Sequence, residues 1–255
     1  MMPMRQLGLA VVLAWLAGGA FAGPLSTELS HTQEQLTAGR ADWRSDELLA
    51  TWRDPTGWTA YGALRRTERF DLVDRQIEAG VGLALAPQWH AEVELTHSNT
   101  HQVLPQTRLS SRLWRQDVGG WNLALGGGRT VYRSAGSRQG SAVVELQAER
   151  YVGDFRLVWA GSMNRLDGGG SAGAHLWRMN WYPNDRWTLG TLLAFGRELE
   201  NLPGTGLVAT RVRGAAFSAR WSMTPVWALS AELSTQRQGD LFERHGLRLG
   251  LRYNP

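Results

Sequence analysis

The 255-residue chain contains no cysteine and no lysine. Without cysteine it has no disulfides and no thiolate metal site, so packing or closure of a sheet must hold the fold together. Arginine is the main basic side chain and the formal net charge is only +4, which gives little support for binding of nucleic acid. Beyond the N-terminal segment no apolar run approaches helix-spanning length, so any insertion into a membrane must use strands.

The N-terminus has the pattern of a secretory signal peptide. Arg5 precedes the apolar core from Leu7 to Leu16, and Ala20-Phe21-Ala22 matches a cleavage site. We therefore expect residues 1–22 to be a cleaved signal peptide and residues 55–255 to form an exported domain. Residues 23–54 are mostly polar, and we expect a short periplasmic segment there, in which 46–53 are compatible with one short strand.

A short turn followed at once by an aromatic residue occurs six times. The aromatic residues are Trp58, Trp89, Trp121, Phe155, Trp187 and Trp227. Most of these signals lie roughly 32 residues apart, a spacing that fits a hairpin of two membrane-crossing strands. Because tryptophan favours a membrane–water interface, the six aromatics are predicted to form a girdle at the periplasmic end of a barrel.

Alternation of apolar and polar residues predicts twelve strands after residue 57. Near the C-terminus, for example, Leu247, Leu249 and Leu251 alternate with Arg248 and Arg252. The predicted strands are 58–68, 74–86, 88–98, 106–116, 120–132, 142–151, 154–164, 173–182, 186–197, 209–222, 226–237 and 243–254.

This alternation is compatible with two architectures. A soluble secreted β-sandwich with a binding function would bury the apolar faces, whereas a membrane barrel turns them toward lipid. The aromatic residues stand at strand starts, and the connections opposite to them, such as 165–172 and 198–208, are longer. Together with the signal peptide, these features favour a twelve-stranded antiparallel up-and-down transmembrane β-barrel in the outer membrane of a Gram-negative bacterium.

In such a barrel the polar faces line the lumen. The candidate lumen-lining residues are Glu149, Arg156, Arg178, Arg220, Glu232, Arg248 and Arg252. Hairpin counting places Arg156 opposite Glu149 and Arg248 opposite Glu232, where opposite charges would stabilise the pairing. The ladder of charges has two interpretations: it satisfies a polar interior, or it forms a constriction that selects charged or sugar-like solutes.

A catalytic site has one local candidate. Thr96-His97-Ser98-Asn99, with Ser110 and Ser111 on the next strand, loosely resembles a Ser–His–Asn hydrolase arrangement. A lipid or lipid A hydrolase built around His97 is therefore an alternative function. The histidines show no metal-ligand spacing and the glycine runs lack a phosphate-binding pattern, so neither a metal nor a cofactor is predicted.

Several short segments, in order and spacing, resemble the YaiO-type family of outer-membrane β-barrel proteins. They are Tyr61-Gly62 with Arg65 and Arg66, Glu68-Arg69-Phe70, Asp74-Arg75-Gln76, Tyr182-Pro183-Asn184-Asp185, the stretch 196–200 and the stretch 246–253. The resemblance implies an outer-membrane location, an association with envelope polysaccharide systems and no established catalytic residues. The expected partners are outer-membrane lipid, the barrel-assembly machinery, and envelope polysaccharide or its export proteins. We expect a non-enzymatic channel or scaffold.

Overall fold

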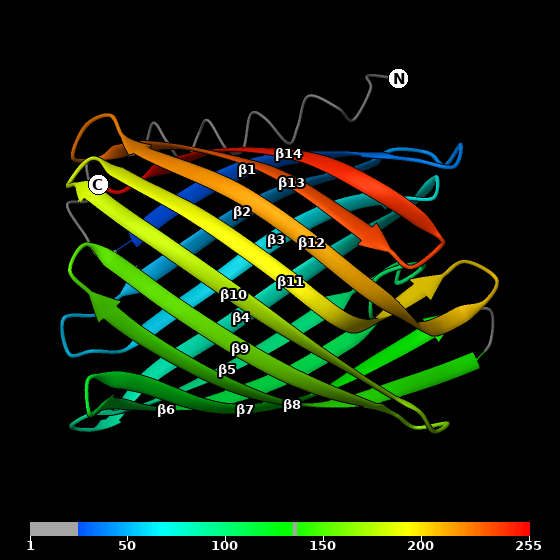
Figure 1. Ribbon diagram of the computed structural model, residues 1–255, viewed down its shortest axis with the longest axis horizontal. Coiled ribbons are helices and arrows are strands. Elements are labelled where there is room, and N and C mark those ends of the chain that lie inside the picture. Colours follow the sequence, from blue (N-terminus) through cyan, green and yellow to red (C-terminus); the bar gives the residue numbers. More distant parts are fainter. Residues whose placement is uncertain (1–24, 135–136) are drawn as a thin grey trace.

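The computed structural model describes residues 25–134 and 137–255 as one closed antiparallel barrel (Figure 1). Each strand pairs with the next along the chain, and the first pairs with the last. The strands are β1 (Leu25–Leu36), β2 (Trp43–Arg53), β3 (Thr59–Arg69), β4 (Leu72–Ala86), β5 (Trp89–Ser98), β6 (Thr107–Val118), β7 (Trp121–Ser134), β8 (Ser137–Val152), β9 (Phe155–Leu166), β10 (Ser171–Asn184), β11 (Trp187–Leu202), β12 (Gly206–Ser222), β13 (Trp227–Gln238) and β14 (Phe242–Tyr253). Within these residues no helix is long and apolar enough to cross a membrane. The predicted signal peptide lies outside the described residues.

The barrel has fourteen strands, and the prediction of twelve is wrong. The twelve predicted strands correspond to β3–β14, while the two additional strands come from the segment expected to be periplasmic. The short strand considered at 46–53 lies within β2, and β1 closes the barrel by pairing with both β2 and β14. The alternation is weak in β1 because its outward positions include His31, Gln33 and Gln35, so a search for one apolar face misses the strand.

Large apolar side chains cover the outside of the barrel. Leu64, Leu125 and Leu233 are each more than half exposed, and every strand from β3 to β14 contributes exposed apolar residues. A soluble sandwich would bury these faces, so the sandwich alternative is wrong. Exposure of a continuous apolar belt is instead what a surface in contact with lipid requires.

The six predicted girdle aromatics all lie at one end of the barrel, where the odd-numbered strands from β3 begin. Three of them pack on aromatics of neighbouring strands: the ring centroids are 6.2 Å apart for Phe155 and Trp181, 5.9 Å for Trp187 and Trp221, and 4.7 Å for Trp227 and Tyr253. The turns at this end are short, as at the periplasmic end of bacterial barrels. The opposite end is called the outer end below.

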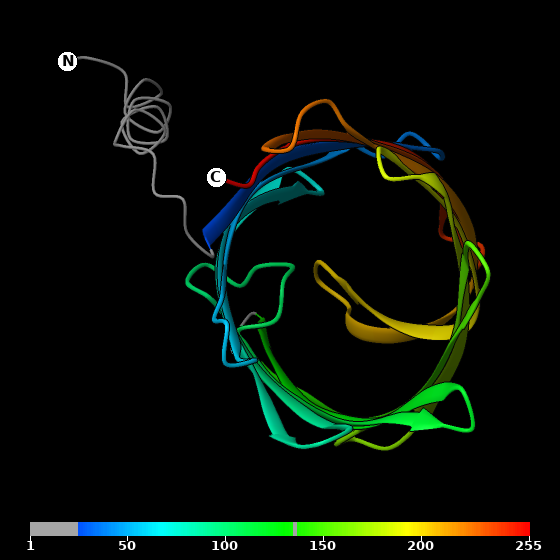
Figure 2. The same ribbon diagram turned by 90° about the vertical axis from the view of Figure 1, so that its left-hand side faces the viewer.

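The connections expected at 165–172 and 198–208 are shorter than predicted, because the strands leave only residues 167–170 and 203–205 between them. In particular, β11 and β12 have 16 and 17 residues. Pairing of β11 with β10 ends at Gly196, and pairing of β12 with β13 ends at Val212. Residues 197–211, the inner hairpin, therefore leave the wall, and Figure 2 shows this gold hairpin inside the ring.

Gly196 sits where the inner hairpin departs. Its φ of 141° belongs to a region that side chains rarely adopt, and a Cβ atom there would lie 2.4 Å from the Gly173 carbonyl oxygen. Only glycine permits this close approach together with this backbone conformation. Residues 99–106, the inner loop, also lie inside the ring, drawn in green (Figure 2).

Candidate functional site: the lumen and its constriction

The seven predicted lumen residues lie on the inward faces of their strands, alternating with exposed apolar residues. Arg178, Arg220, Glu232 and Arg248 line adjoining cavities on the side formed by β10–β14. Glu149 and Arg156 lie on β8 and β9. Arg252, near the periplasmic end, donates hydrogen bonds to Ser26 and Asn254.

Glu149 and Arg156 form an ion pair, but not in the register that hairpin counting gave. The two-residue turn after Val152 places Arg156 opposite Tyr151 and Glu149 opposite Val158, so the prediction of direct opposition is wrong. Arginine is long enough to reach the diagonal neighbour, and Arg156 Nη2 lies 2.5 Å from Glu149 Oε2. The Glu149 side chain is only 9% exposed, so this pair is the most enclosed charge contact on that side of the lumen.

Arg248 lies directly opposite Glu232, and the predicted register is confirmed there. The guanidinium nevertheless turns toward the strands that close the barrel. Its Nη2 donates to Ser30 Oγ at 3.1 Å and to Glu47 Oε1 at 3.2 Å. Both partners lie in β1 and β2, which were not among the predicted strands, so these contacts were not expected. Glu232 is left without this partner.

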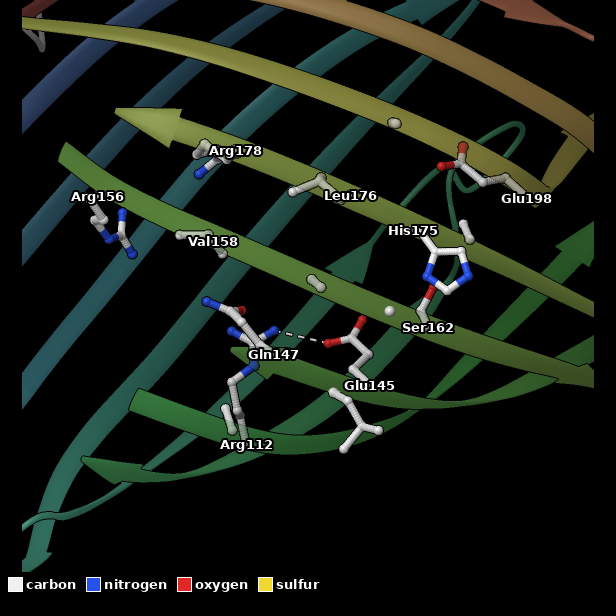
Figure 3. A pocket seen from close by; sticks show the side chains of 16 residues that line it. Arg112, Glu145, Gln147, Arg156, Val158, Ser162, His175, Leu176, Arg178 and Glu198 are labelled. Atoms are coloured by element: carbon white, nitrogen blue, oxygen red, sulfur yellow. Dashed lines mark hydrogen bonds and ion pairs between the residues drawn. The ribbon is translucent and has the colours of Figure 1, made fainter. Parts of the chain in front are cut away.

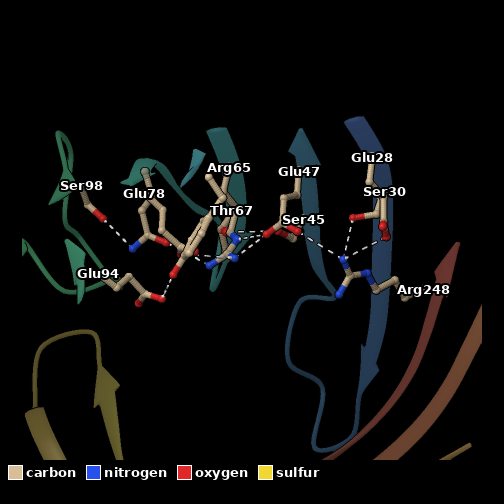
Figure 4. A network of polar contacts seen from close by, with 12 residues as sticks. Glu28, Ser30, Ser45, Glu47, Arg65, Thr67, Glu78, Glu94, Ser98 and Arg248 are labelled. Atoms are coloured by element: carbon tan, nitrogen blue, oxygen red, sulfur yellow. Dashed lines mark hydrogen bonds and ion pairs between the residues drawn. The ribbon is translucent and has the colours of Figure 1, made fainter. Parts of the chain in front are cut away.

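The contacts of Arg248 continue around the wall as a polar network (Figure 4). Arg65 Nε donates to Glu47 Oε2 at 2.8 Å, and Arg65 Nη1 donates to Gln76 Oε1 at 3.0 Å. Gln76 Nε2 in turn donates to Ser98 Oγ at 3.2 Å. The network joins β14 to β5 across the closing strands and satisfies most of the charges on this wall.

Open space borders both walls. Beside the network a cavity of about 220 Å³ is lined by Glu47, Arg65 and Arg248, and two further cavities lie along β10–β14. One of these two, of about 370 Å³, is lined by Arg220, Arg248 and Glu232, and the other, of about 180 Å³, by Arg178 and Glu232. Small residues at Gly190 and Ala216 leave this room. Among the described residues, no carboxylate lies within 4.0 Å of the Arg178 guanidinium.

Arg178 also lines another cavity, of about 310 Å³, whose residues are drawn in Figure 3. Arg112 and Glu145 form an ion pair there at 2.9 Å, and Arg156 lies nearby at the edge of the same cavity. Because shared residues link this cavity to the two along β10–β14, polar space extends along the inside of the barrel from β8 to β14.

The inner loop is fixed by one fully buried carboxylate. Asp74 accepts hydrogen bonds from the backbone N–H groups of Gln102, Val103 and Leu104 at 2.7–2.8 Å. Asn201 of the inner hairpin donates from Nδ2 to the Val103 carbonyl oxygen at 3.2 Å. The loop and the hairpin thus meet inside the lumen.

Two further contacts hold the inner hairpin across the barrel. The Leu207 backbone N–H donates to Gln139 Oε1 on β8 at 2.9 Å, and Glu200 Oε1 lies 3.8 Å from Arg69 Nη1 on β3. Hairpin and loop together form a constriction at the outer end. Sequence reasoning missed it, and the one available signal was the polar, glycine-containing stretch 198–208, which was assigned to an external loop.

The polar residues around His97 divide between the two faces of the wall, and Ser111, opposite Val93, is the predicted serine that shares the outward face with His97. His97 faces outward on β5, where its Nδ1 lies 3.5 Å from Thr107 Oγ1, whereas Ser98 faces the lumen and is bound by Gln76. Ser110 also faces inward, opposite Glu94. In the part of the chain that the structure describes, no three His, Asp or Glu side chains gather closely enough to hold a metal.

A closed antiparallel barrel with an apolar exterior, an aromatic girdle and a charged interior defines a class: the transmembrane β-barrels of bacterial outer membranes. No protein-family model and no curated protein matches the sequence.

Solved structures agree with this class. The outer-membrane protein Omp33 of Acinetobacter baumannii has a TM-score of 0.56 at 8% identity, over 91% of this chain and 100% of that one. The CymD monoaromatic hydrocarbon channel also has 0.56 at 8% identity, over 90% and 87%. An anion-selective porin from Comamonas acidovorans has 0.51 at 9% identity, over 90% and 98%. At such identities the similarity shows the fold alone.

Proposed function

We propose that this protein is a non-enzymatic outer-membrane channel for small polar solutes that carry acidic groups. The observation that carries the proposal is the linked polar space beside Arg178, whose guanidinium has no carboxylate within 4.0 Å among the described residues. A scaffold role alone does not require an arginine that faces an internal cavity without a carboxylate partner. A guanidinium in that position attracts an anionic group of a passing solute.

The distribution of charge across the lumen supports the same function. In a closed ring of fourteen strands, β5 lies diametrically across from β12. Glu92 and Glu94 face inward on β5, whereas Arg220 faces inward on β12. Glu92 lies 3.6 Å from Arg112 and Arg220 lies 3.4 Å from Glu28, so these partners reduce the field between the two walls. The remaining transverse field lies near the periplasmic end, where it would orient dipolar and acidic solutes.

A narrower proposal is that the solute is an acidic envelope polysaccharide or a fragment of one. The resemblance to YaiO-type proteins supports it, and so does the chemistry of the lumen. Arginines would bind the carboxylates of acidic sugars. Glutamates would accept hydrogen bonds from the sugar hydroxyl groups, and serines would donate hydrogen bonds to them or accept hydrogen bonds from them.

The test is single-channel conductance and reversal potential of the refolded mature protein in planar bilayers. Wild-type protein should conduct, and Arg178→Ala should shift the ratio of anion to cation permeability toward cations. Glu232→Ala should shift this ratio toward anions. Leu249→Ala, on the lipid-facing side of β14, is the matched control and should change neither quantity.

A closed scaffold is the second candidate, and the contacts of the inner hairpin with β3 and β8 favour it. Absence of conductance from a barrel that still shows the heat-dependent gel shift of a folded outer-membrane protein would refute the channel and support the scaffold.

A further inference from the structure

Four exposed arginines gather at the outer end of the barrel, where the inner hairpin joins the wall. Arg213 and Arg237 lie on the paired wall, while Arg197 and Arg211 are the first and last residues of the inner hairpin, and the Arg211 carbonyl oxygen still accepts a hydrogen bond from the Gly239 N–H on the wall side. Arg197 lies opposite Arg211, and Arg213 lies opposite Arg237. Arg211 and Arg213 are two positions apart on the same strand and therefore share a face. These four residues are called the outer arginine patch.

The patch places like charges directly across from one another. Directly opposed side chains have Cβ atoms about 5 Å apart, and like charges at that separation destabilise the pairing of the strands. Arg237 has acidic neighbours, with Glu243 at 3.6 Å and Asp240 at 4.0 Å, and Arg197 donates to the Ala209 carbonyl oxygen at 3.4 Å. Among the described residues, no carboxylate lies within 4.0 Å of Arg211 or Arg213. The patch therefore has positive charge that the protein does not neutralise.

Beside Arg213 and further toward the membrane, the same face becomes apolar. Phe195 lies opposite Arg213, and Phe217 lies opposite Leu233. These three apolar side chains are 45–61% exposed. Cationic groups above and bare apolar surface below match an amphiphile that has an anionic headgroup and acyl chains.

We propose that the outer arginine patch binds a phosphate-bearing glycolipid of the outer leaflet, with lipid A as its chemical type. Arginine forms forked, charge-assisted hydrogen bonds with phosphate, and one phosphate between Arg211 and Arg213 would relieve their mutual repulsion. The acyl chains would lie over Phe217 and Leu233. The patch is at the end of the barrel opposite the aromatic girdle, where the outer leaflet lies in the proposed orientation. The site is separate from the lumen and does not depend on conduction.

The experiment measures lipid binding to the refolded mature protein in detergent micelles by native mass spectrometry. The probes are bisphosphorylated lipid A, the same lipid without phosphates, and inorganic phosphate as a competitor. The variant is Arg211→Gln/Arg213→Gln. The matched control is Arg66→Gln/Arg129→Gln, which removes two exposed outward arginines at the same end that already have carboxylate partners in Glu68 and Asp167.

We expect the patch variant to bind bisphosphorylated lipid A at least about tenfold more weakly, which corresponds to roughly 1.4 kcal/mol. The control variant should bind like the wild type, the lipid without phosphates should bind weakly to every variant, and millimolar inorganic phosphate should not displace lipid A. Equal affinity of wild type and patch variant, an equal loss in the control variant, or displacement by inorganic phosphate would each overturn the assignment. The heat-dependent gel shift verifies that each variant is folded. If the double variant does not fold, the single variant Arg213→Gln takes its place in the same binding measurement.

Discussion

Shortening the inner hairpin tests whether it constricts a real channel. Replacing residues 199–209 by Asn-Gly joins Glu198 to Thr210, which already face each other across the strand pair, through a turn suited to a two-residue hairpin. The change removes the contacts of Asn201, Leu207 and Glu200 with the rest of the lumen. It leaves all pairing of β11 with β10 and of β12 with β13 in place.

The expected magnitude follows from barrel geometry. Fourteen strands spaced ~4.8 Å apart and tilted by ~40° give a backbone radius of ~14 Å. An inward side-chain layer ~5 Å deep, half the usual distance between packed sheets, leaves an aperture of ~18 Å. A two-stranded ribbon ~10 Å wide covers more than half of that aperture, so its removal should raise the conductance roughly two- to threefold.

The assay is single-channel recording in planar bilayers, on wild type and on the shortened variant, at one salt concentration. The control replaces residues 167–169 by Asn-Gly, which joins Leu166 to Gly170, two residues that already face each other in the register of β9 and β10. This shortens a turn of similar position whose Asp167 contacts the outward-facing Arg129 rather than the inner hairpin. An unchanged conductance in a folded shortened variant would refute the role of the hairpin. An equal rise in conductance in the control would show that shortening any turn at the outer end raises the conductance, so the inner hairpin would have no special role.

Three further predictions concern what holds the barrel and its constriction together. Arg156→Gln should lower the free energy of unfolding, measured by urea titration, by about 1–3 kcal/mol, because Glu149 is left enclosed without its partner. In the same titrations the double variant Arg156→Gln/Glu149→Gln should recover part of this loss. Asp74→Asn should increase hydrogen exchange of the amides in the inner loop at least about tenfold, because an amide offers one acceptor oxygen where the carboxylate uses two. Trp187→Ala should lower stability by about 1 kcal/mol in the same titrations through loss of ring stacking in the girdle.

Most of the barrel could be predicted because the alternation of its strands is strong. From β3 onward, inward polar and outward apolar residues repeat with period two, and this pattern located all twelve of those strands. The first two strands failed the same test for a physical reason. Their outward residues include His31 and Asp46, which form a hydrogen-bonded pair at 2.7 Å instead of contributing to the apolar belt. Pairing between two neighbouring polar side chains replaces the apolar alternation there, so a search for period two does not find these strands.

The constriction could not be predicted because its cause is not local. Residues 198–208 contain Pro203, Gly204 and Gly206, a composition typical of a loop, yet most of them belong to paired strands. What directs this hairpin inward is the contact of Gly196 with the backbone of Gly173 and the hydrogen bond of Asn201 with the inner loop. Both contacts join positions that are distant in the sequence, and no periodicity reveals them.

The two missed strands also change which charges can act on a solute. Arg248 was expected to pair with Glu232, but the closing strands supply Glu47 and Ser30, which bind it instead. Arg248 is therefore part of the seam that closes the barrel, while Glu232 and Arg178 face the cavities without that partner. It follows that Arg248→Ala should mainly weaken the fold, whereas substitutions of Arg178 and Glu232 should mainly change ion selectivity. Closure of the barrel by β1 and β2 thus assigns structural and solute-facing roles to residues that look equivalent in the sequence.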